Sequence, residues 1–332
     1  MREITITQND ADQRLDRFLK KYLAKAPLSA IYKIVRKDVK VNGKRQKEDY
    51  MLRPGDVLSL YLADQDIEAY SQKTRPHTAK RQFTVCYEDD NLIIVSKPYG
   101  LLVHGDKTEK KDTLANQVVD YLIETGAYSP RAERSFVPSP VHRLDRNTTG
   151  LVIFGKNAEA LRVLSAMLKK EPDCSEESQN GSAGRALRKI YLTIVEGRLE
   201  KELHLKNKLL KDEQRNRGKV LPLSTAEGKY IETIARPVYS NGRYTLTEVE
   251  LVTGRSHQIR AHLSRAGHPL LGDTKYGGHS AADRTTQLLH AWKIEFTDAP
   301  EPLAYLNGKT VEAPLPFDWK ITQTRLLGKE IY

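Results

Sequence analysis

Residues 140–154 read PVHRLDRNTTGLVIF, and this stretch decides how the larger part of the chain is interpreted. Its last four residues, Leu151–Phe154, form a short apolar run typical of a buried strand. The residues before them are rich in hydrogen-bonding groups, and loops at strand ends are where catalytic groups tend to lie. Asp145 stands there beside Arg143 and Arg146, whose positive charge would keep its carboxylate ionised for work as a nucleophile or base. An exposed loop of ion pairs is the alternative that this local pattern leaves open.

Apolar runs of the same kind recur from Phe83 onward. We expect strands at Leu92–Val95, Leu151–Phe154, Tyr191–Val195 and Tyr244–Leu251, and helices at 113–124, 158–169 and 256–265. Residues 171–184 are rich in Ser, Gly and acids and poor in apolar residues, which predicts a surface insertion. Residues 83–325 are therefore expected to form one strand-rich domain.

A second polar cluster, Thr253–His262, follows the last of these expected strands. Gly254 permits a tight turn, and Ser256 is a candidate N-cap for the helix after it. Arg255 and Arg260 supply cations that can pair with a carboxylate or contact phosphates. The segment could therefore provide both a partner for Asp145 and contacts to a polyanion.

The chain shows no motif for a metal or a cofactor. His257 and His262 are five residues apart, which does not place both on one helical face, so a zinc-protease site is rejected. The two cysteines, Cys86 and Cys174, lie far apart without metal-ligand spacing. P-loop, glycine-rich dinucleotide and nucleophile-elbow motifs are missing as well. We expect neither a metal nor a cofactor, and RNA contact or packing for the histidines.

Residues 1–65 have a pattern of short local elements. Strands are expected at Glu3–Thr7, Val39–Val41 and Val57–Leu62, and helices from Arg14 onward and at Ser29–Arg36, with Ser29 as N-cap. Residues 66–82 are polar, lack periodicity and contain Pro76, which indicates a flexible linker. The expected organisation is a small α/β domain (1–65), a linker (66–82) and the large domain (83–325).

The small domain is strongly basic where its helices lie. Between Arg14 and Lys47 there are twelve Lys or Arg residues and only two acids, Asp16 and Asp38. A one-signed surface suits a phosphate backbone, whereas a merely solvated face normally mixes signs. The residues expected to contact RNA here are Arg14, Arg17, Lys33, Arg36, Lys37, Lys40 and Lys44.

The whole chain has 332 residues and a formal charge of +11, which is compatible with a polyanionic partner. It contains no apolar run long enough to cross a bilayer, so a membrane protein is excluded. The first residues lack the apolar stretch of an export signal. We expect a cytoplasmic protein.

The small domain resembles the alpha-L RNA-binding domain. The resemblance lies in Arg14–Leu19 (RLDRFL), the helix at 29–36, Lys40–Gly43 (KVNG) and Leu52–Asp56 (LRPGD). It implies RNA binding without naming a reaction.

From Val85 to Phe317 the chain resembles the RluA family of pseudouridine synthases. The most specific match is His142-Arg143-Leu144-Asp145 followed by Thr148–Leu151 (TTGL). Further matches are Tyr87–His104, Lys189–Tyr191 (KIY), Gly254–Arg260 (GRSHQIR), Gly267–Asp273 (GHPLLGD) and Leu289–Ala291 (LHA). The resemblance implies an α+β fold with a mixed, mainly antiparallel sheet and flanking helices.

The resemblance also implies an isomerase that converts uridine in RNA to pseudouridine without a cofactor, acting as a monomer. Asp145 would be the catalytic carboxylate, Arg255 its ion-pair partner and Tyr191 the residue that stacks on the uracil. Arg143 would fill the gap left by the extruded uridine, and the other residues expected at the RNA are His142, His257, Gln258 and Arg260. The alpha-L domain and the length resemble members that act on large-subunit ribosomal RNA.

Other classes remain as alternatives. These are a non-catalytic RNA-binding assembly factor, an enzyme of the same kind acting on transfer RNA, a methyltransferase and a basic ribosomal protein. The set Asp145, Tyr191 and Arg255 argues against a mere binder, and the missing glycine-rich loop argues against a methyltransferase.

Overall fold

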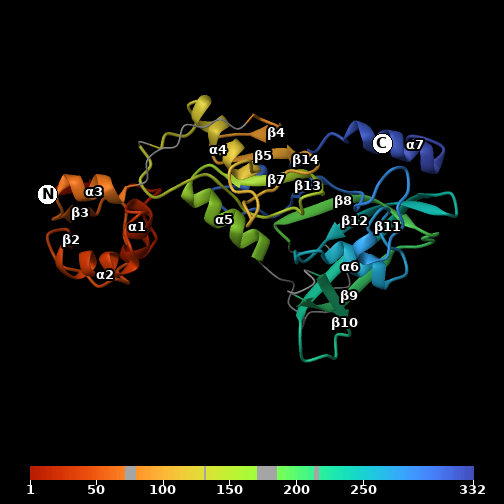
Figure 1. The fold of residues 1–332 in the computed structure, drawn as a ribbon, viewed down its shortest axis with the longest axis horizontal. Helices are drawn as coiled ribbons and strands as arrows, with labels where there is room; N and C mark the ends of the chain where they lie inside the picture. The colour runs from red at the N-terminus through yellow and green to blue at the C-terminus, as the bar shows by residue number, and fades with distance from the viewer. Residues whose placement is uncertain (72–79, 131, 170–184, 213–216) are drawn as a thin grey trace. The chain divides into compact units, whose positions relative to one another are not determined.

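The structure, a computed structural model, describes residues 1–71, 80–130, 132–169, 185–212 and 217–332, so the expected insertion at 171–184 lies outside it. The chain divides into two compact units (Figure 1). The first comprises Met1–Arg81, Asn116–Ser139 and Gly155–Arg162, and the second comprises Gln82–Ala115, Pro140–Phe154 and Val163–Tyr332. Within the first unit, the buried Ser135 hydroxyl donates to Asp10 (2.7 Å) and accepts from Gln13 (2.9 Å), which ties segment 116–139 to the N-terminal residues.

The first unit contains a three-stranded antiparallel sheet in its described residues, ordered β1 (Arg2–Thr5), β3 (Val57–Leu60), β2 (Val39–Val41). Helices α1 (Leu15–Tyr22), α2 (Leu28–Lys37) and α3 (Asp64–Tyr70) accompany it. Apolar residues three or four positions apart, such as Leu15, Phe18 and Leu19, are fully buried in one core. The helical spacing read from the sequence thus positions the core and leaves the basic residues of α1 and α2 outward.

Two expectations for this unit are wrong in detail. Ser29 is not the N-cap of α2, because the helix begins one residue earlier and Pro27 takes that place. Residues 66–70, expected in the linker, belong to α3. The reason is Ile67, which is fully buried in the core and anchors the helix, while acidic residues in its first turn suit the positive end of the helix dipole.

The second unit is built on a large sheet, eleven-stranded in the described residues. Its path runs β10 (Arg217–Leu221), β9 (Leu203–Asp212), β11 (Lys229–Ser240), β12 (Tyr244–Leu251), β8 (Leu187–Glu196), β13 (Leu289–Phe296), β7 (Thr149–Gly155), β5 (Leu92–Lys97), β4 (Thr84–Glu88), with β14 (Thr310–Glu312) on β13 and β6 (Ser139–Pro140) on β7. The pairing of β13 with β7 is parallel, and the other pairs with a described register are antiparallel. The expected α+β class with a mixed, mainly antiparallel sheet is confirmed.

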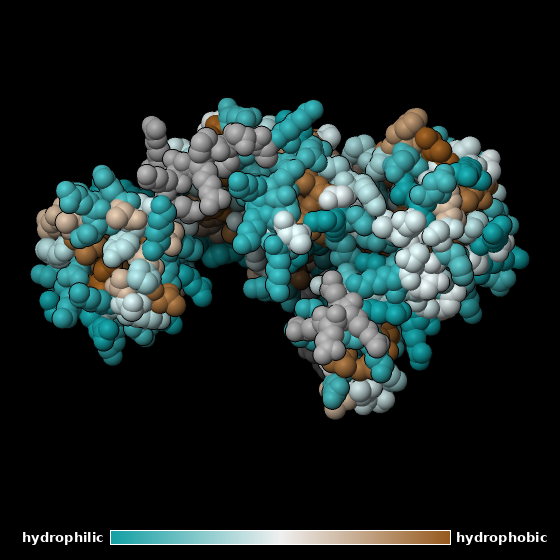
Figure 2. Space-filling view, viewed as in Figure 1, coloured by the Kyte–Doolittle hydropathy of each residue, from teal (hydrophilic) through white to brown (hydrophobic). Residues whose placement is uncertain are grey.

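The remaining helices and short helical turns are α4 (Leu114–Glu124), α5 (Ala158–Lys169), α6 (Gln258–Arg265), η1 (Thr274–Tyr276), η2 (Ala304–Leu306) and α7 (Phe317–Leu327). Helix α6 contacts β10, β11 and η1 over a small core that includes Leu209, Ile231 and Tyr276 (Figure 1). Helix α7 packs Trp319 against the sheet, but leaves Phe317 and Ile321 exposed, and Figure 2 shows hydrophobic residues at the surface over this helix.

The helices and the acidic, histidine and cysteine side chains of the described part of the chain bear on two other classes of site. None of its helices is both long and apolar enough to span a membrane. Over the same residues, no three His, Cys, Asp or Glu side chains gather as ligands for a metal ion.

Candidate active site

Asp145 lies in the loop between β6 and β7, and contacts to the residues that follow Asp145 fix that loop. Nζ of Lys97, a residue that is 1% exposed, donates to the carbonyls of Pro98 (2.8 Å), Leu101 (2.9 Å) and Arg146 (2.9 Å), and burial lowers the pKa of Lys97 to about 7. At the far end of the loop, the hydroxyl of Thr149 bonds to Nδ1 of buried His290 (2.7 Å). The residue after Asp145 is therefore clamped from the neighbouring strand β5.

The carboxylate of Asp145 is held by the guanidinium of Arg260. Nη1 of Arg260 donates to Oδ2 of Asp145 (3.1 Å), while Nε and Nη2 donate to the two oxygens of Asp273 (2.7 and 2.8 Å). Burial acts to lower the pKa of Arg260, but the hydrogen bonds and charges of Asp273 and Asp145 outweigh it and raise that pKa. The side chain of Asp145 is 29% exposed and that of Asp273 only 1%, so Asp145 is the carboxylate that a substrate can reach.

The turn before α6 is fixed by Gln258. Its amide oxygen accepts from the hydroxyl of Thr253 (2.9 Å) and from the backbone N–H of Arg255 (3.1 Å). Its amide nitrogen donates to the carbonyl of Glu232 (2.9 Å) and the hydroxyl of Thr233 (3.0 Å). Because these bonds define the turn, His257 is held in the left-handed backbone region (φ 58°) as the N-cap of α6, and the expected cap at Ser256 is wrong.

Tyr191 lies on β8 within the electrostatic reach of Asp145. Its side chain is buried, and burial, followed by the negative charge of Asp145, raises the pKa of its hydroxyl, which stays protonated at neutral pH. Lys189 lies two residues earlier on the same face of β8, and burial, with the charge of Arg185, lowers its pKa to about 8. This face of β8 therefore carries a neutral phenol and a readily deprotonated amine.

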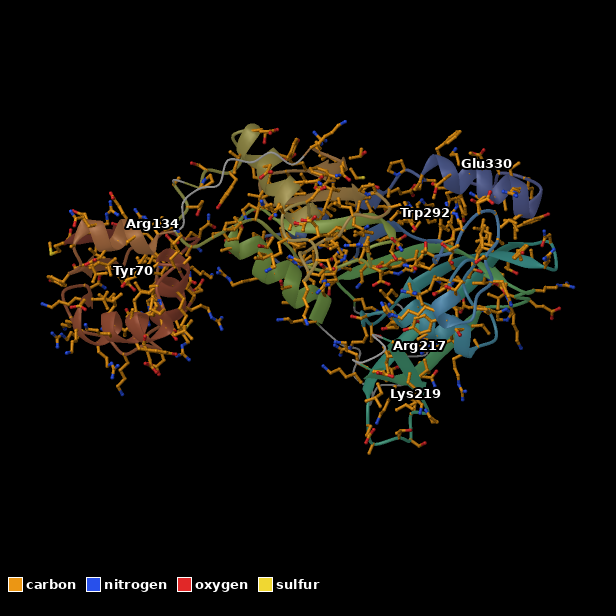
Figure 3. All side chains as sticks on the ribbon, viewed as in Figure 1. Tyr70, Arg134, Arg217, Lys219, Trp292 and Glu330 are labelled. Atoms are coloured by element: carbon orange, nitrogen blue, oxygen red, sulfur yellow. The ribbon has the colours of Figure 1, made fainter. Side chains whose placement is uncertain are left out.

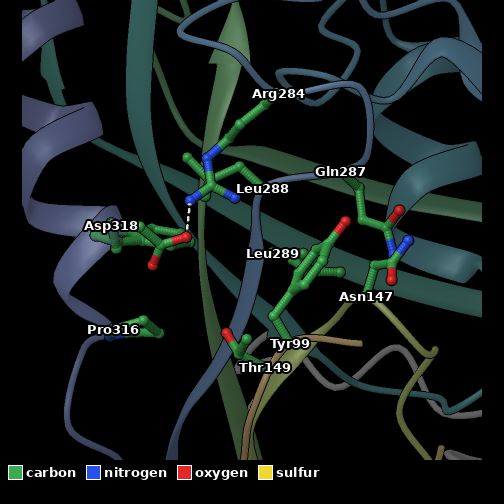
Figure 4. A pocket seen from close by; sticks show the side chains of 10 residues that line it. Tyr99, Asn147, Thr149, Arg284, Gln287, Leu288, Leu289, Pro316 and Asp318 are labelled. Atoms are coloured by element: carbon green, nitrogen blue, oxygen red, sulfur yellow. Dashed lines mark hydrogen bonds and ion pairs between the residues drawn. The ribbon is translucent and has the colours of Figure 1, made fainter. Parts of the chain in front are cut away.

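A small pocket lies where the loop that carries Asp145 enters β7 (Figure 4). It is lined by Tyr99, Asn147, Thr149, Arg284, Gln287, Leu288, Leu289, Pro316, Asp318 and Trp319, and Arg284 pairs with Asp318 across it. Asp145, Tyr191 and Arg260 are not part of its lining. We therefore place the candidate active site at Asp145 rather than in this pocket.

Residues 91–265 match the family model described as RNA pseudouridylate synthase, a range that includes Asp145, Tyr191 and Arg260. The chain belongs to that family. Its resemblance to the RluA synthases is thereby confirmed, and the chain is an RNA pseudouridine synthase.

Similar proteins extend the match over most of the synthase. This chain is 32% identical to an uncharacterized RNA pseudouridine synthase of Mycoplasma capricolum, and the aligned region covers 94% of this chain and 97% of that protein. Ribosomal large subunit pseudouridine synthase C of Vibrio vulnificus is 33% identical, covering 89% of this chain and 88% of the relative. The solved structure of human RNA pseudouridylate synthase domain containing 4 shares the fold at 20% identity, with a TM-score of 0.56 over 73% of this chain and 92% of that one.

Within the segment GRSHQIR, the arginine described at Asp145 differs from the one expected. The resemblance implied an ion pair between Asp145 and Arg255, whereas the guanidinium described at Asp145 is that of Arg260, five residues later. Arg255 lies in the turn before α6, and its catalytic role stays a prediction. A signal for Arg260 was present in the sequence, because Asp273, in the matched segment 267–273, is an acid that needs a cation once it is buried.

Two residues expected at the RNA serve the protein interior instead. Gln258 is 1% exposed and uses its amide oxygen and nitrogen in the turn, and Arg260 is 6% exposed with its guanidinium on two carboxylates.

His142 is half-buried, and its Nε2 accepts the N–H of Ile153 (3.3 Å). Burial, with the nearby charge of Lys189, lowers the pKa of His142 to about 3, so it is neutral. Arg143 is exposed beside Asp145 and remains available to a ligand.

The basic residues expected at the RNA in the first unit lie mostly at its surface. Arg17, Lys33, Arg36, Lys37 and Lys44 are exposed. Arg14 is also exposed but pairs with Asp16 (3.1 Å), and Lys40 is half-buried with its ammonium 5.4 Å from the ring centre of Tyr61. Basic residues of the second unit were not among the expected RNA contacts, although Lys206 of β9 and Arg217 and Lys219 of β10 are exposed. Figure 3 labels Arg217 and Lys219.

Proposed function

We propose that this synthase modifies uridines of large-subunit ribosomal RNA, with Asp145 as its catalytic carboxylate. The relatives named as large-subunit synthases, at 32–33% identity over most of the chain, support the substrate. The observation that carries the site is the carboxylate of Asp145, bound at Oδ2 by a buried guanidinium yet still partly exposed.

The reaction moves a glycosidic bond within one nucleotide. The bond between uracil N1 and ribose C1′ breaks, the base turns, and C5 bonds to C1′. C5 then loses its proton and N1 takes one up, so the product is an isomer of uridine. Asp145 would either attack the sugar or base covalently or remove a sugar proton to give a glycal. Both routes need an oriented carboxylate, and the hydrogen bond from Nη1 of Arg260 holds Oδ2 of Asp145 in place.

The residues around Asp145 have matching roles in this proposal. Tyr191, kept neutral by burial, would stack on the uracil and take part in the proton transfer from C5. Arg143 would occupy the space vacated by the extruded uridine, whose unstacking costs a few kcal/mol. The exposed cations of α1 and α2 would bind neighbouring phosphates and offset that cost. We further propose that the enzyme works as a cytoplasmic monomer.

The test uses RNA tritiated at uridine C5, because isomerisation releases that tritium to water. The purified chain should release tritium from transcripts of large-subunit ribosomal RNA faster than from transfer RNA transcripts of equal uridine content. Equal or preferential release from transfer RNA would overturn the ribosomal assignment. Mapping pseudouridines in cells with and without the protein then identifies the positions.

A further inference from the structure

His257 makes contacts that the proposed mechanism does not yet use. Its Nε2 lies 3.7 Å from Oδ2 of Asp145, and its Nδ1 lies 3.0 Å from the hydroxyl of Tyr276. The left-handed backbone at His257 is an unfavourable conformation for a non-glycine residue, and the turn held by Gln258 imposes it. A strained residue beside a reactive group suggests that the orientation of its side chain matters.

The hydrogen bonds of Tyr276 favour one of the two tautomers of His257. The hydroxyl oxygen of Tyr276, a buried residue, accepts the backbone N–H of Gly218 (2.7 Å). The phenolic proton is then free to point to Nδ1 of His257, which becomes an acceptor. The ring proton of a neutral imidazole consequently resides on Nε2, the nitrogen that faces Asp145.

We propose that His257 is a positioning residue: with Tyr276 fixing its Nε2–H form, it and Arg260 hold Oδ2 of Asp145 from two sides and leave Oδ1 to react. Both contacts meet the same oxygen, Oδ2. The distance of 3.7 Å is slightly longer than a hydrogen bond, and contacts of this kind commonly shorten when substrate binds. The inference rests on the proposed role of Asp145 and replaces the RNA contact expected for His257.

Burial favours the neutral form of His257, while the charges around it act in both directions. Burial lowers its pKa most; the negative charges of Asp145 and Asp273 act to raise it, and the positive charges of Arg260 and Lys275 act to lower it. The net direction is downward from the ordinary value of 6.5, so the ring is neutral at pH 7. Protonation at lower pH removes the acceptor at Nδ1 and breaks the arrangement with Tyr276.

The test compares His257→Asn with His257→Gln in the full chain. Asn tolerates the left-handed backbone, so the fold is retained, but its amide reaches only the position of Nδ1. Gln can place an N–H near the position of Nε2. The assay is tritium release from ribosomal transcripts. We expect His257→Asn to lower kcat about 10²-fold, as for a misplaced reacting group, with KM within about twofold of wild type. His257→Gln should recover much of the lost kcat.

The pH profile and two further variants complete the test. The loss of wild-type kcat at acid pH, below the ordinary histidine range, should move or vanish in His257→Asn. Tyr276→Phe should lower kcat while leaving RNA affinity unchanged. The control is His279→Asn, since the His279 side chain is 85% exposed on another loop, and it should behave as wild type.

A wild-type kcat and an unchanged loss of activity at acid pH in His257→Asn would overturn the inference. A higher KM or Kd for RNA at constant kcat would also overturn it and would indicate that His257 contacts the RNA. Failure of the wild-type chain to release tritium would instead contradict the proposed function. The two failures are thus distinguishable.

Discussion

Replacing Arg260 with Met tests the ion-pair network at the catalytic carboxylate. Met preserves much of the aliphatic volume but removes three hydrogen bonds, two to Asp273 and one to Asp145. Asp273 is 1% exposed, so its carboxylate would be left buried without its cation. Breaking a buried pair in this way costs about 3–5 kcal/mol, which corresponds to a fall in Tm of roughly 6–20 °C at the usual 2–4 °C per kcal/mol for a unit of this size.

The same variant should lose activity for a different reason, namely the loss of the group that orients Asp145. The double variant Arg260→Met/Asp273→Leu separates the two effects, because removing both partners of a buried pair is often neutral for stability. We expect thermal denaturation to show recovery of most of the lost Tm, while tritium release stays at the level of Arg260→Met. A single variant with wild-type Tm and wild-type kcat would refute the role given to Arg260.

Three further predictions concern stability and RNA binding. Glu250 is fully buried and pairs with Arg185 (2.9 Å), Arg188 (2.8 Å) and Arg236 (3.2 Å), so Glu250→Gln should cost about 3–5 kcal/mol in denaturant unfolding at pH 7. Burial acts to raise the pKa of Glu250, but the arginines lower it below 4.5. The contribution of Glu250 to the free energy of unfolding is therefore present above pH 4.5 and lost as the pH falls. The Tm of Glu250→Gln should consequently depend less on acid pH than that of the wild type. Lys97→Met removes a donor from the carbonyls of Pro98, Leu101 and Arg146, of which only that of Arg146 keeps a second donor described here, the N–H of Gly100 (3.1 Å). The variant should lower both Tm and kcat, whereas equal activity would show that the contacts of Lys97 to the loop are dispensable. Arg36→Glu/Lys37→Glu should weaken RNA binding and flatten its salt dependence without changing Tm, and an unchanged salt slope would argue against RNA contact by α2.

The sequence predicted those strands of the large sheet that are buried apolar runs, but not strands such as β9 and β10, most of whose residues are exposed or half-buried. Strand β12 has the expected bounds, and the run 151–154 lies within β7, of which every residue is buried. Helix α5 also has the expected bounds, since its apolar spacing is regular. Boundaries failed where tertiary contacts decide them, as for α3, whose helical form depends on the burial of Ile67 in a core made by distant residues.

The site was predicted in part for a related reason. Asp145 and Tyr191 follow from specific motifs, but the choice between Arg255 and Arg260 depends on where α6 begins. That point is set by the hydrogen bonds of Gln258 and by the left-handed backbone at His257, neither of which the local pattern reveals. The sequence identified the segment that faces the carboxylate, and only the fold assigns its side chains.

The most direct test of the account is single-turnover tritium release by Asp145→Asn on a ribosomal RNA transcript. The introduced carboxamide keeps the size of the side chain but cannot act as a nucleophile or base, and Arg260 retains Asp273, so the fold should persist. The matched control is Asp283→Asn, because the Asp283 side chain is 91% exposed and pairs with Arg325.

We predict that Asp145→Asn releases no tritium while binding RNA with nearly wild-type affinity, and that Asp283→Asn reacts normally. Release by Asp145→Asn at the wild-type rate would contradict the central claim that this one carboxylate carries the chemistry.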